Sequence, residues 1–374
     1  MLVGVPKERK SLEYRVGLTP SSVREVIAHG HQVLIEKNAG TKIGFDDAAY
    51  QQVGAHIAHS TVEIFERSDL IVKVKEPQPE ECKLLRANQM LFAFLHLAPD
   101  PEQTALLQQS GCIAIAYETV TNHAGGLPLL APMSEVAGRM AIQAGATSLE
   151  IKNGGRGILL GGVPGVAPAS VVILGGGVVG INAIRVAIGM GARVTVIDKS
   201  LERLNQLDKQ FGSQIITLFS TQHSIEETVL TADLVIGAVL IPGASAPRLI
   251  TKKMLTQMQT GAVIVDVAID QGGCFETSKP TTHEHPTYII DGIVHYCVSN
   301  MPGAVPRTST VALNNATLPF VLELANFGYK EAMRRNRNLL HGLNICEGKI
   351  TYKAVADALH QPYISAEEMV VARG

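Results

Sequence analysis

The sequence predicts an α/β fold of two doubly wound domains with parallel sheets. Short apolar or β-branched runs, typical of buried strands, alternate with segments of helical periodicity. The alternation occurs twice, on either side of a glycine- and proline-rich break at Asn122–Pro128. Alternating strands and helices favour a parallel sheet covered by helices on both faces. With 374 residues, the chain is long enough for two domains that each bury a core.

The first half of the chain opens on a strand and a helix with a clear start signal. Thr19 is a candidate N-cap and Pro20 a candidate first helical residue. The strands predicted in this half are Leu2–Val5, Gln32–Ile35, Leu70–Val74, Met90–Leu95 and Ile113–Ala116. The helices predicted in this half lie near Pro20–His29, Asp46–Val53, Thr61–Arg67, Glu80–Arg86 and Pro101–Gln109.

The second half begins with a long amphipathic helix near Ser134–Ile151 and a loop at Asn153–Pro168. A strand–helix series follows, and beyond Pro306 the pattern is helical to the end. The predicted strands and helices of this series are Ser170–Leu174, Val178–Met190, Arg193–Ile197, Leu201–Phe211, Gln214–Leu218, Leu234–Ala238 and Ala262–Val267.

The terminal helices have no sheet of their own, so we expect them to pack on the first domain. That domain is then discontinuous, comprising residues 1–128 and 306–374, and residues 129–305 form the second domain. We expect long helices near Ser134–Ile151 and Ser309–Ala325 to bridge the domains and leave a cleft between them.

Composition excludes several classes of protein. Hydrophobic residues are 46% and charged residues 18%, which is typical of a globular chain. The net charge of -2 and the lack of long basic runs argue against a nucleic-acid or membrane-surface partner. The 5 cysteines are odd in number and widely spaced, which argues against a disulfide framework and a zinc site. The cysteine pattern indicates a reducing setting. No signal sequence is evident, so we expect that setting to be the cytoplasm.

One stretch, Val171–Ala192, is long and apolar enough to suggest a membrane span, with only Arg185 charged. It contains consecutive glycines, however, and a buried strand, a turn and a helix explain it better.

The turn in that stretch carries a dinucleotide-binding fingerprint. Gly175, Gly177 and Gly180 form Gly-x-Gly-x-x-Gly between an apolar strand and a helix. The first glycine permits the tight turn, the second lets the backbone approach a pyrophosphate, and the third lets helix and strand pack closely. The phosphates then lie at the helix N-terminus. The pattern predicts a Rossmann-like domain.

Asp198 ends the next strand at the distance where a carboxylate holds the ribose 2′-hydroxyl. This carboxylate favours NAD over NADP, because a 2′-phosphate would meet a negative charge. Lys199 and Arg203 lie nearby in the sequence and weaken that preference.

Ionisable residues follow other predicted strands, where ligands of open α/β sheets collect. Lys75 and His96 follow strands of the first domain, Asp270 follows one of the second, and Arg15 lies in the loop after the first strand. Arg and Lys suit a substrate carboxylate, and His suits the proton transfer that accompanies hydride transfer. An Asp can orient water or stabilise an iminium cation. The set predicts oxidation at a carbon that bears an amine or hydroxyl beside a carboxylate.

Each of these residues also has an alternative interpretation. Lys75 and Arg15 fit solvated surface charges, His96 a hydrogen-bonded core histidine, and Asp270 a turn residue before two glycines. Asp266 lies within a strand and is better explained as buried and structural.

The spacing of His283 and His285 suggests a metal pair. Without a third ligand, a loop is the better explanation, and we predict no metal site.

Several contiguous segments of the chain match the pattern of a known family. They are Gly4–Arg9, Tyr14–Pro20, Lys73–Pro77, Leu95–Asp100, Gly175–Gly180 with Asp198, Asp266–Gly273 and Ser299–Pro306. With these segments the chain closely resembles the alanine dehydrogenase family over its whole length, and the transhydrogenase NAD-binding subunit shares part of the pattern.

The resemblance implies reversible NAD-dependent oxidative deamination of L-alanine to pyruvate and ammonium. It implies that Arg15 and Lys75 bind the substrate, that His96 is the acid/base, and that Asp270 assists it. It also implies a homohexamer. By resemblance and fingerprint together, the predicted cofactor contacts are Ser134, Gly175, Gly177, Val178, Val179, Gly180, Asp198, Arg203, Ser220, Val239, Leu240, Val267, Ala268, Ile269, Asp270, Val298, Ser299, Asn300 and Met301.

Two other functions are compatible with part of the pattern. A proton-translocating transhydrogenase subunit would require membrane helices and a second nucleotide domain, here or on a partner. A non-catalytic NAD-sensing module would bind NADH without turning over alanine. The lack of a predicted membrane span and the amino-acid-site motifs argue against the transhydrogenase subunit. The set of Lys75, His96 and Asp270 argues against the sensing module.

Overall fold

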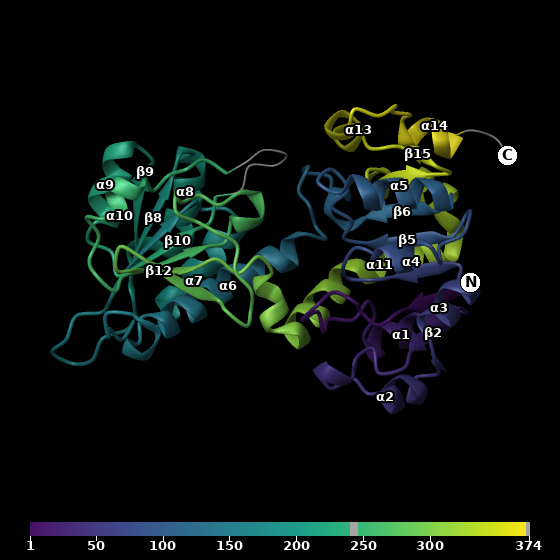
Figure 1. The fold of residues 1–374 in the computed structure, drawn as a ribbon, viewed down its shortest axis with the longest axis horizontal. Helices are drawn as coiled ribbons and strands as arrows, with labels where there is room; N and C mark the ends of the chain where they lie inside the picture. Colours follow the sequence, from purple (N-terminus) through teal and green to yellow (C-terminus); the bar gives the residue numbers. More distant parts are fainter. Residues whose placement is uncertain (240–245, 372–374) are drawn as a thin grey trace. The chain divides into compact units, whose positions relative to one another are not determined.

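The computed structural model describes residues 1–239 and 246–371, and these form two compact units (Figure 1). Unit 1 comprises Met1–Met133 and Val305–Gly374, and unit 2 comprises Ser134–Ala304. Each unit has a mainly parallel sheet flanked by helices. The predicted α/β fold with two Rossmann-like domains is therefore confirmed. The sheets are not purely parallel, however, because each carries antiparallel strands at one edge.

The sheet of unit 1 has the strand order β15-β14-β6-β5-β4-β1-β2-β3. All pairs from β1 to β6 are parallel, as the alternation predicted. The strand β3 was not predicted, because three residues give too short an apolar run. The strands are β1 (Leu2–Val5), β2 (Gln32–Glu36), β3 (His56–Ala58), β4 (Leu70–Val72), β5 (Met90–Ala93), β6 (Ile113–Ala116), β14 (Leu343–Cys346) and β15 (Lys349–Ile350).

The strands β14 and β15 correct the expectation that the chain is helical beyond Pro306. They form a hairpin whose turn, Glu347-Gly348, has positive φ at both residues, and β14 pairs antiparallel with β6. Figure 1 shows this C-terminal segment beside β6. Apolar runs this short do not distinguish a strand from a helix by periodicity.

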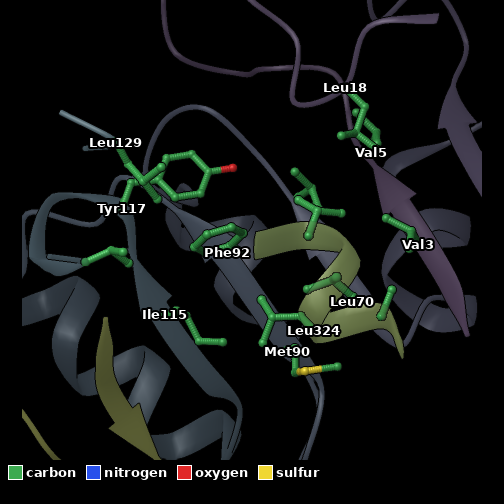
Figure 2. Packing of buried hydrophobic residues seen from close by; sticks show 14 of the residues in the cluster. Val3, Val5, Leu18, Leu70, Met90, Phe92, Ile115, Tyr117, Leu129 and Leu324 are labelled. Carbon is green, nitrogen blue, oxygen red and sulfur yellow. The ribbon is translucent and has the colours of Figure 1, made fainter. Parts of the chain in front are cut away.

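Helices cover both faces of this sheet. Neighbouring strand residues point to opposite faces, so Leu70 and Val72 contact one helical layer and Ile71 the other. Figure 2 shows the first layer, where Leu324 packs near Leu70 and Met90. The helices of unit 1 are α1 (Pro20–Ala28), α2 (Asp47–Gln52), α3 (Thr61–Arg67), α4 (Pro79–Cys82), α5 (Pro101–Ser110), α11 (Pro306–Arg335, with a non-helical Gly328), α12 (Arg337–Leu340), α13 (Lys353–Leu359) and α14 (Ala366–Val371).

The sheet of unit 2 has the order β12-β13-β11-β10-β7-β8-β9, with β12 antiparallel and the other pairs parallel. The hairpin of β12 and β13 was not predicted, because no helix separates these two strands and strand–helix alternation therefore does not indicate them. The strands are β7 (Ser170–Leu174), β8 (Arg193–Asp198), β9 (Ile215–Phe219), β10 (Leu234–Gly237), β11 (Val263–Asp266), β12 (Thr287–Ile290) and β13 (Ile293–Tyr296).

Helices also pack on both faces of this second sheet. The apolar stretch that resembled a membrane span forms β7 and α7, as the glycines predicted. Over the described ranges, no helix is both long and apolar enough to cross a membrane. The helices are α6 (Ala131–Ser148, which begins in unit 1), α7 (Val178–Gly189), α8 (Leu201–Phe211), α9 (Gln222–Val229) and α10 (Lys252–Leu255).

Candidate active site

In unit 1, two predicted site residues follow adjacent parallel strands. Lys75 lies just beyond β4 and His96 just beyond β5. The pairing of these strands continues past their ends, because the Phe94 amide donates to the Val74 carbonyl at 3.1 Å. The structure thus brings the backbones of Lys75 and His96 to the same end of the sheet, where the parallel strands finish.

Arg15 is 3% exposed, so its interpretation as a solvated surface charge is wrong. Its guanidinium donates from Nε to Oε1 of Glu13 at 2.7 Å and from Nη2 to Oε2 at 2.6 Å. Its Nη1 lies 3.1 Å from the sulfur of Met133. Burial alone would raise the pKa of Glu13, but the hydrogen bonds and charge of Arg15 lower it. The two-point contact holds the guanidinium in one orientation.

Lys75 is partly buried, and its nearest ionic partner is Glu76, with Nζ 4.0 Å from Oε2. This is the longest ion pair found among the described residues. The other oxygen of Glu76 pairs with Lys10. Burial would raise the pKa of Glu76, but the charges of Lys75 and Lys10 lower it. The ammonium group of Lys75 is therefore loosely held compared with the guanidinium of Arg15.

His96 is exposed, so its interpretation as a core histidine is wrong. Its ring stacks on Phe94 with centroids 6.0 Å apart. Its backbone has φ 51°, a left-handed conformation that is uncommon for histidine. Glu118 supports this conformation by accepting the amides of His96 at 2.6 Å and Leu95 at 3.2 Å.

Glu118 was missed by the sequence reasoning. It lies two residues after β6, so the strand-end rule that selected Lys75 and His96 also points to it.

A buried charge cluster lies beneath Lys75. Lys73 is 0% exposed, with Nζ 2.8 Å from Glu81 and 3.3 Å from Glu8. Burial lowers the pKa of Lys73, but the two carboxylates more than offset this and raise it. The pKa of Glu8 is raised, because burial outweighs the charge of Lys73. Sequence reasoning did not select Glu8, although it lies in one of the matching segments.

In unit 2, the three fingerprint glycines differ in backbone conformation and in the space around them. Gly175 has φ +99°, and a Cβ there would lie 2.7 Å from the carbonyl oxygen of Ala238. A Cβ at Gly180 would lie 1.9 Å from the carbonyl oxygen of Gly175. Gly177 has an ordinary φ of -68°, and, its chain neighbours aside, no atom of the described residues would lie within 4 Å of a Cβ there. The protein's own packing therefore requires glycine at the first and third positions only, while the second leaves open space over the N-terminus of α7. This arrangement fits a pyrophosphate.

Asp198 ends β8 beside this turn. Its carboxylate accepts the amide of Gly176 at 2.7 Å and that of Ser200 at 2.8 Å. The Ser220 amide donates to the Asp198 carbonyl at 3.0 Å, so the ends of β8 and β9 are joined here. Arg203 lies in the first turn of α8, with its guanidinium 2.9 Å from Gln206. The carboxylate of Asp198 is thus held at the carboxyl end of β8, where a ribose would lie.

Asp266 and Asp270 have different environments. Asp266 is 0% exposed, as expected of a structural residue. It accepts the amides of Ala268 at 3.1 Å and Cys274 at 2.9 Å, and also the hydroxyl of Ser278. Burial raises its pKa despite these bonds. Asp270 is exposed in the short 3-10 turn Ile269–Gln271. Asp266 therefore closes the loop that carries Asp270.

The other predicted cofactor residues are distributed around the same sheet. Ser134 lies in the first turn of α6, and Val178 and Val179 begin α7. Val239 follows β10, whereas Leu240 lies outside the described residues. Val267, Ala268 and Ile269 follow β11, and Val298, Ser299, Asn300 and Met301 follow β13.

The histidine pair does not form a metal site in the described parts of the chain. Nε2 of His283 lies 2.9 Å from the backbone oxygen of Asn300. Within residues 1–239 and 246–371, no group of three His, Cys, Asp or Glu side chains is arranged to hold a metal ion.

Comparisons with known proteins agree on one family. Residues 4–137 match the family described as alanine dehydrogenase/PNT, N-terminal domain, and residues 141–353 match its C-terminal domain. An alanine dehydrogenase of Halomonas elongata is 56% identical over 99% of this chain and 100% of its own length. One of Methanococcus maripaludis is 53% identical over 98% and 99%. A solved L-alanine dehydrogenase structure has a TM-score of 0.94 and 52% identity, covering 96% of this chain and 99% of its own.

Proposed function

This chain belongs to the alanine dehydrogenase/PNT family, and from that premise we propose that it is an NAD-dependent L-alanine dehydrogenase. The proposed reaction converts L-alanine, NAD and water to pyruvate, ammonium, NADH and a proton, and it is reversible. Unit 1 is the proposed substrate domain and unit 2 the proposed cofactor domain. The observation that carries the proposal is the position of Lys75 and His96 beyond adjacent strands of one sheet.

In unit 1, Lys75 and Arg15 are the proposed partners of the substrate carboxylate. The loosely held ammonium of Lys75 supports this role, because a carboxylate can approach it without breaking a short ion pair. Glu13 already engages two nitrogens of Arg15, so we expect Arg15 to orient the substrate more than to neutralise it.

His96 is the proposed acid/base. Its exposed ring can accept a proton from the substrate amine and from the attacking water, and it can return a proton to the departing ammonia. The positive charges of Lys75 and Arg15 beside the bound substrate disfavour the charged ammonium form of its amine, so deprotonation of the amine is favoured.

In unit 2, the proposed cofactor contacts are the open turn at Gly177, the carboxylate of Asp198, and the segments after β11 and β13. Bound NAD supplies the hydride acceptor for the oxidation. Asp270, exposed on its short turn, is proposed to stabilise the positive iminium carbon of the substrate and to orient the water that attacks it.

Absorbance of NADH tests this function directly. We expect L-alanine with NAD to produce NADH, and pyruvate with ammonium to consume it. A lack of turnover in both directions would refute the proposal. Assays with NADP test the role of Asp198, and preference for NADP would contradict it.

We also propose a homohexamer, as the resemblance to the family implies, and a cytoplasmic location, as the cysteine pattern indicates. The molar mass of the purified protein from light scattering tests the assembly. Fractionation of cells that express the chain tests the location.

A further inference from the structure

The cation that we propose for the substrate carboxylate, Lys75, lies past the last regular pair of its strand. The strand β1 pairs with β4 only through Val3–Leu70 and Gly4–Ile71. On the other side of β4, the Lys73 amide donates to Phe92. Because amides alternate along a strand, the Val74 amide points toward β1, where regular pairing has ended. A backbone donor in that position requires another acceptor.

Glu8 supplies this acceptor. Its Oε1 accepts the Val74 amide at 2.7 Å, and its Oε2 accepts the Lys75 amide at 3.3 Å. The Val74 carbonyl is bound as well, by the amide of Phe94 at 3.1 Å. The peptide that leads into Lys75 is therefore held from both sides.

The carboxylate of Glu8 is fixed in turn by a buried cation. Its side chain is 2% exposed, and its Oε2 lies 3.3 Å from Nζ of Lys73. Glu81 holds the same ammonium at 2.8 Å, but its other oxygen accepts the amide of Gln78. Glu8 and Glu81 are thus matched in burial and in their ionic partner, and they differ in the backbone that they hold.

We infer that Glu8 is a positioning residue that holds the Val74–Lys75 backbone so that the Lys75 ammonium is presented to the substrate carboxylate. This inference rests on the proposed function of Lys75. Among the described residues, the one ion pair of the Lys75 side chain is the loose pair with Glu76, so the anchoring of its backbone limits where its ammonium can reach. Glu8 itself contacts neither substrate nor cofactor in this assignment.

Three variants of the full-length protein test the inference: Glu8→Gln, Glu81→Gln as the matched control, and Lys75→Ala. Gln keeps the shape of Glu8 but replaces one acceptor oxygen by a donor group that faces an amide and an ammonium. We expect Glu8→Gln to raise KM for pyruvate about tenfold, with a smaller change in kcat, because small misplacement of a binding group weakens substrate binding. We expect Glu81→Gln to leave KM for pyruvate unchanged.

Two further measurements separate positioning from general destabilisation. Amide hydrogen exchange of the peptide that contains Val74 and Lys75 should accelerate in Glu8→Gln and not in Glu81→Gln. In the Lys75→Ala background, Glu8→Gln should raise KM no further, because Glu8 acts through Lys75.

The inference is overturned if exchange at Val74 and Lys75 is unchanged in Glu8→Gln, if both Gln variants raise KM equally, or if the effects of Glu8→Gln and Lys75→Ala add. If Glu8→Gln does not fold, Glu8→Asp keeps the charge beside Lys73 but shortens the reach to the backbone, and the same criteria apply. Failure of the wild-type protein to turn over alanine would refute the proposed function alone, because the exchange experiment needs no turnover.

Discussion

The two units order their parallel strands in the same way, but they differ in the segments that follow the ends of these strands. Unit 1 has the order β3-β2-β1-β4-β5-β6, and unit 2 has β9-β8-β7-β10-β11-β13. In both, the order reverses beside the first strand, which is where open α/β sheets bind ligands. In unit 2 a tight glycine turn follows that strand. In unit 1 a longer loop follows it and carries Glu8, which pairs with the buried Lys73. The same loop carries the buried ion pair of Glu13 and Arg15.

Under the proposed function, this difference lets one topology serve two kinds of ligand. A pyrophosphate is bound mainly through backbone amides and a helix N-terminus, so side chains must be absent from the turn. A small carboxylate substrate offers less surface for contact than a dinucleotide does, so charged side chains that are themselves held by ion pairs must recognise it. The comparison predicts that substitutions in unit 1 impair turnover and substrate binding, and that substitutions in the glycine turn impair cofactor binding.

The largest expected effect is on turnover. We expect His96→Ala to reduce kcat about 10³-fold, equivalent to about 4 kcal/mol of transition-state stabilisation, because the acid/base is lost. NADH binding, measured by fluorescence, should remain, since His96 lies in unit 1. Asp270→Asn should also abolish turnover and largely spare NADH binding, because Asp270 is not expected to carry the pyrophosphate.

His360→Ala is the matched control for His96→Ala. His360 is exposed, lies in unit 1 and has φ 53°, so it shares the residue type and backbone conformation of His96. Its replacement should leave kcat unchanged. Near-normal turnover of His96→Ala or of Asp270→Asn would remove the catalytic role of that residue.

The second effect is on stability and its pH dependence. Glu13→Gln leaves Arg15 buried beside a neutral partner, and we expect a loss of about 3 kcal/mol at neutral pH. The pKa of Glu13 is lowered, so its contribution is full above the ordinary value of 4.5 and decreases as pH falls through the lowered value. The difference between wild type and variant, measured by urea unfolding, should therefore shrink below about pH 4.5.

Glu63→Gln is the control, because Glu63 also pairs with an arginine and has a lowered pKa but is much less buried than Glu13. It should not change stability measurably. A pH-independent loss in Glu13→Gln would mean that packing, not the Arg15 ion pair, explains it.

The smallest effect concerns the open position in the glycine turn. Gly177→Ala should weaken NADH binding about 30-fold, or about 2 kcal/mol, because the methyl group occupies the space above the turn. The thermal midpoint should not fall, because the added methyl would meet no atom within 4 Å in the part of the protein that the structure describes, its chain neighbours aside.

Gly189→Ala, at the other end of α7, also adds a methyl group to open space and should bind NADH normally. Gly180→Ala should destabilise unit 2, because its Cβ would overlap the Gly175 carbonyl. If Gly177→Ala bound NADH normally, the open turn would not be the pyrophosphate site.

The sequence predicted the central strands well because their apolar runs lie between strong turn signals. It also predicted the strand ends, and with them Lys75, His96 and Asp270, whose geometric positions follow from the strand order. The strand β14, which lies between β6 and the edge strand β15, was missed, because a short apolar run beside predicted helices does not distinguish a strand from a helix by periodicity. Glu8 was missed for a different reason, because its importance lies in hydrogen bonds to backbone far away in the sequence, which no local pattern records. Glu118 follows β6, so the strand-end rule could have found it, although its bonds to the backbone of Leu95 and His96 are equally distant in sequence.

The division of unit 1 into two segments has a consequence for synthesis on the ribosome. The strands β1 to β6 emerge first, but α11, which covers one face of their sheet through Leu313, Val321 and Leu324, emerges only after all of unit 2. At usual elongation rates this leaves roughly 10 to 30 seconds between the two segments. During that interval the apolar face around Leu70 and Phe92 lacks its partner in the nascent chain. Unit 2, which is continuous, can complete its fold first, and the last helices then close the domain that began the chain.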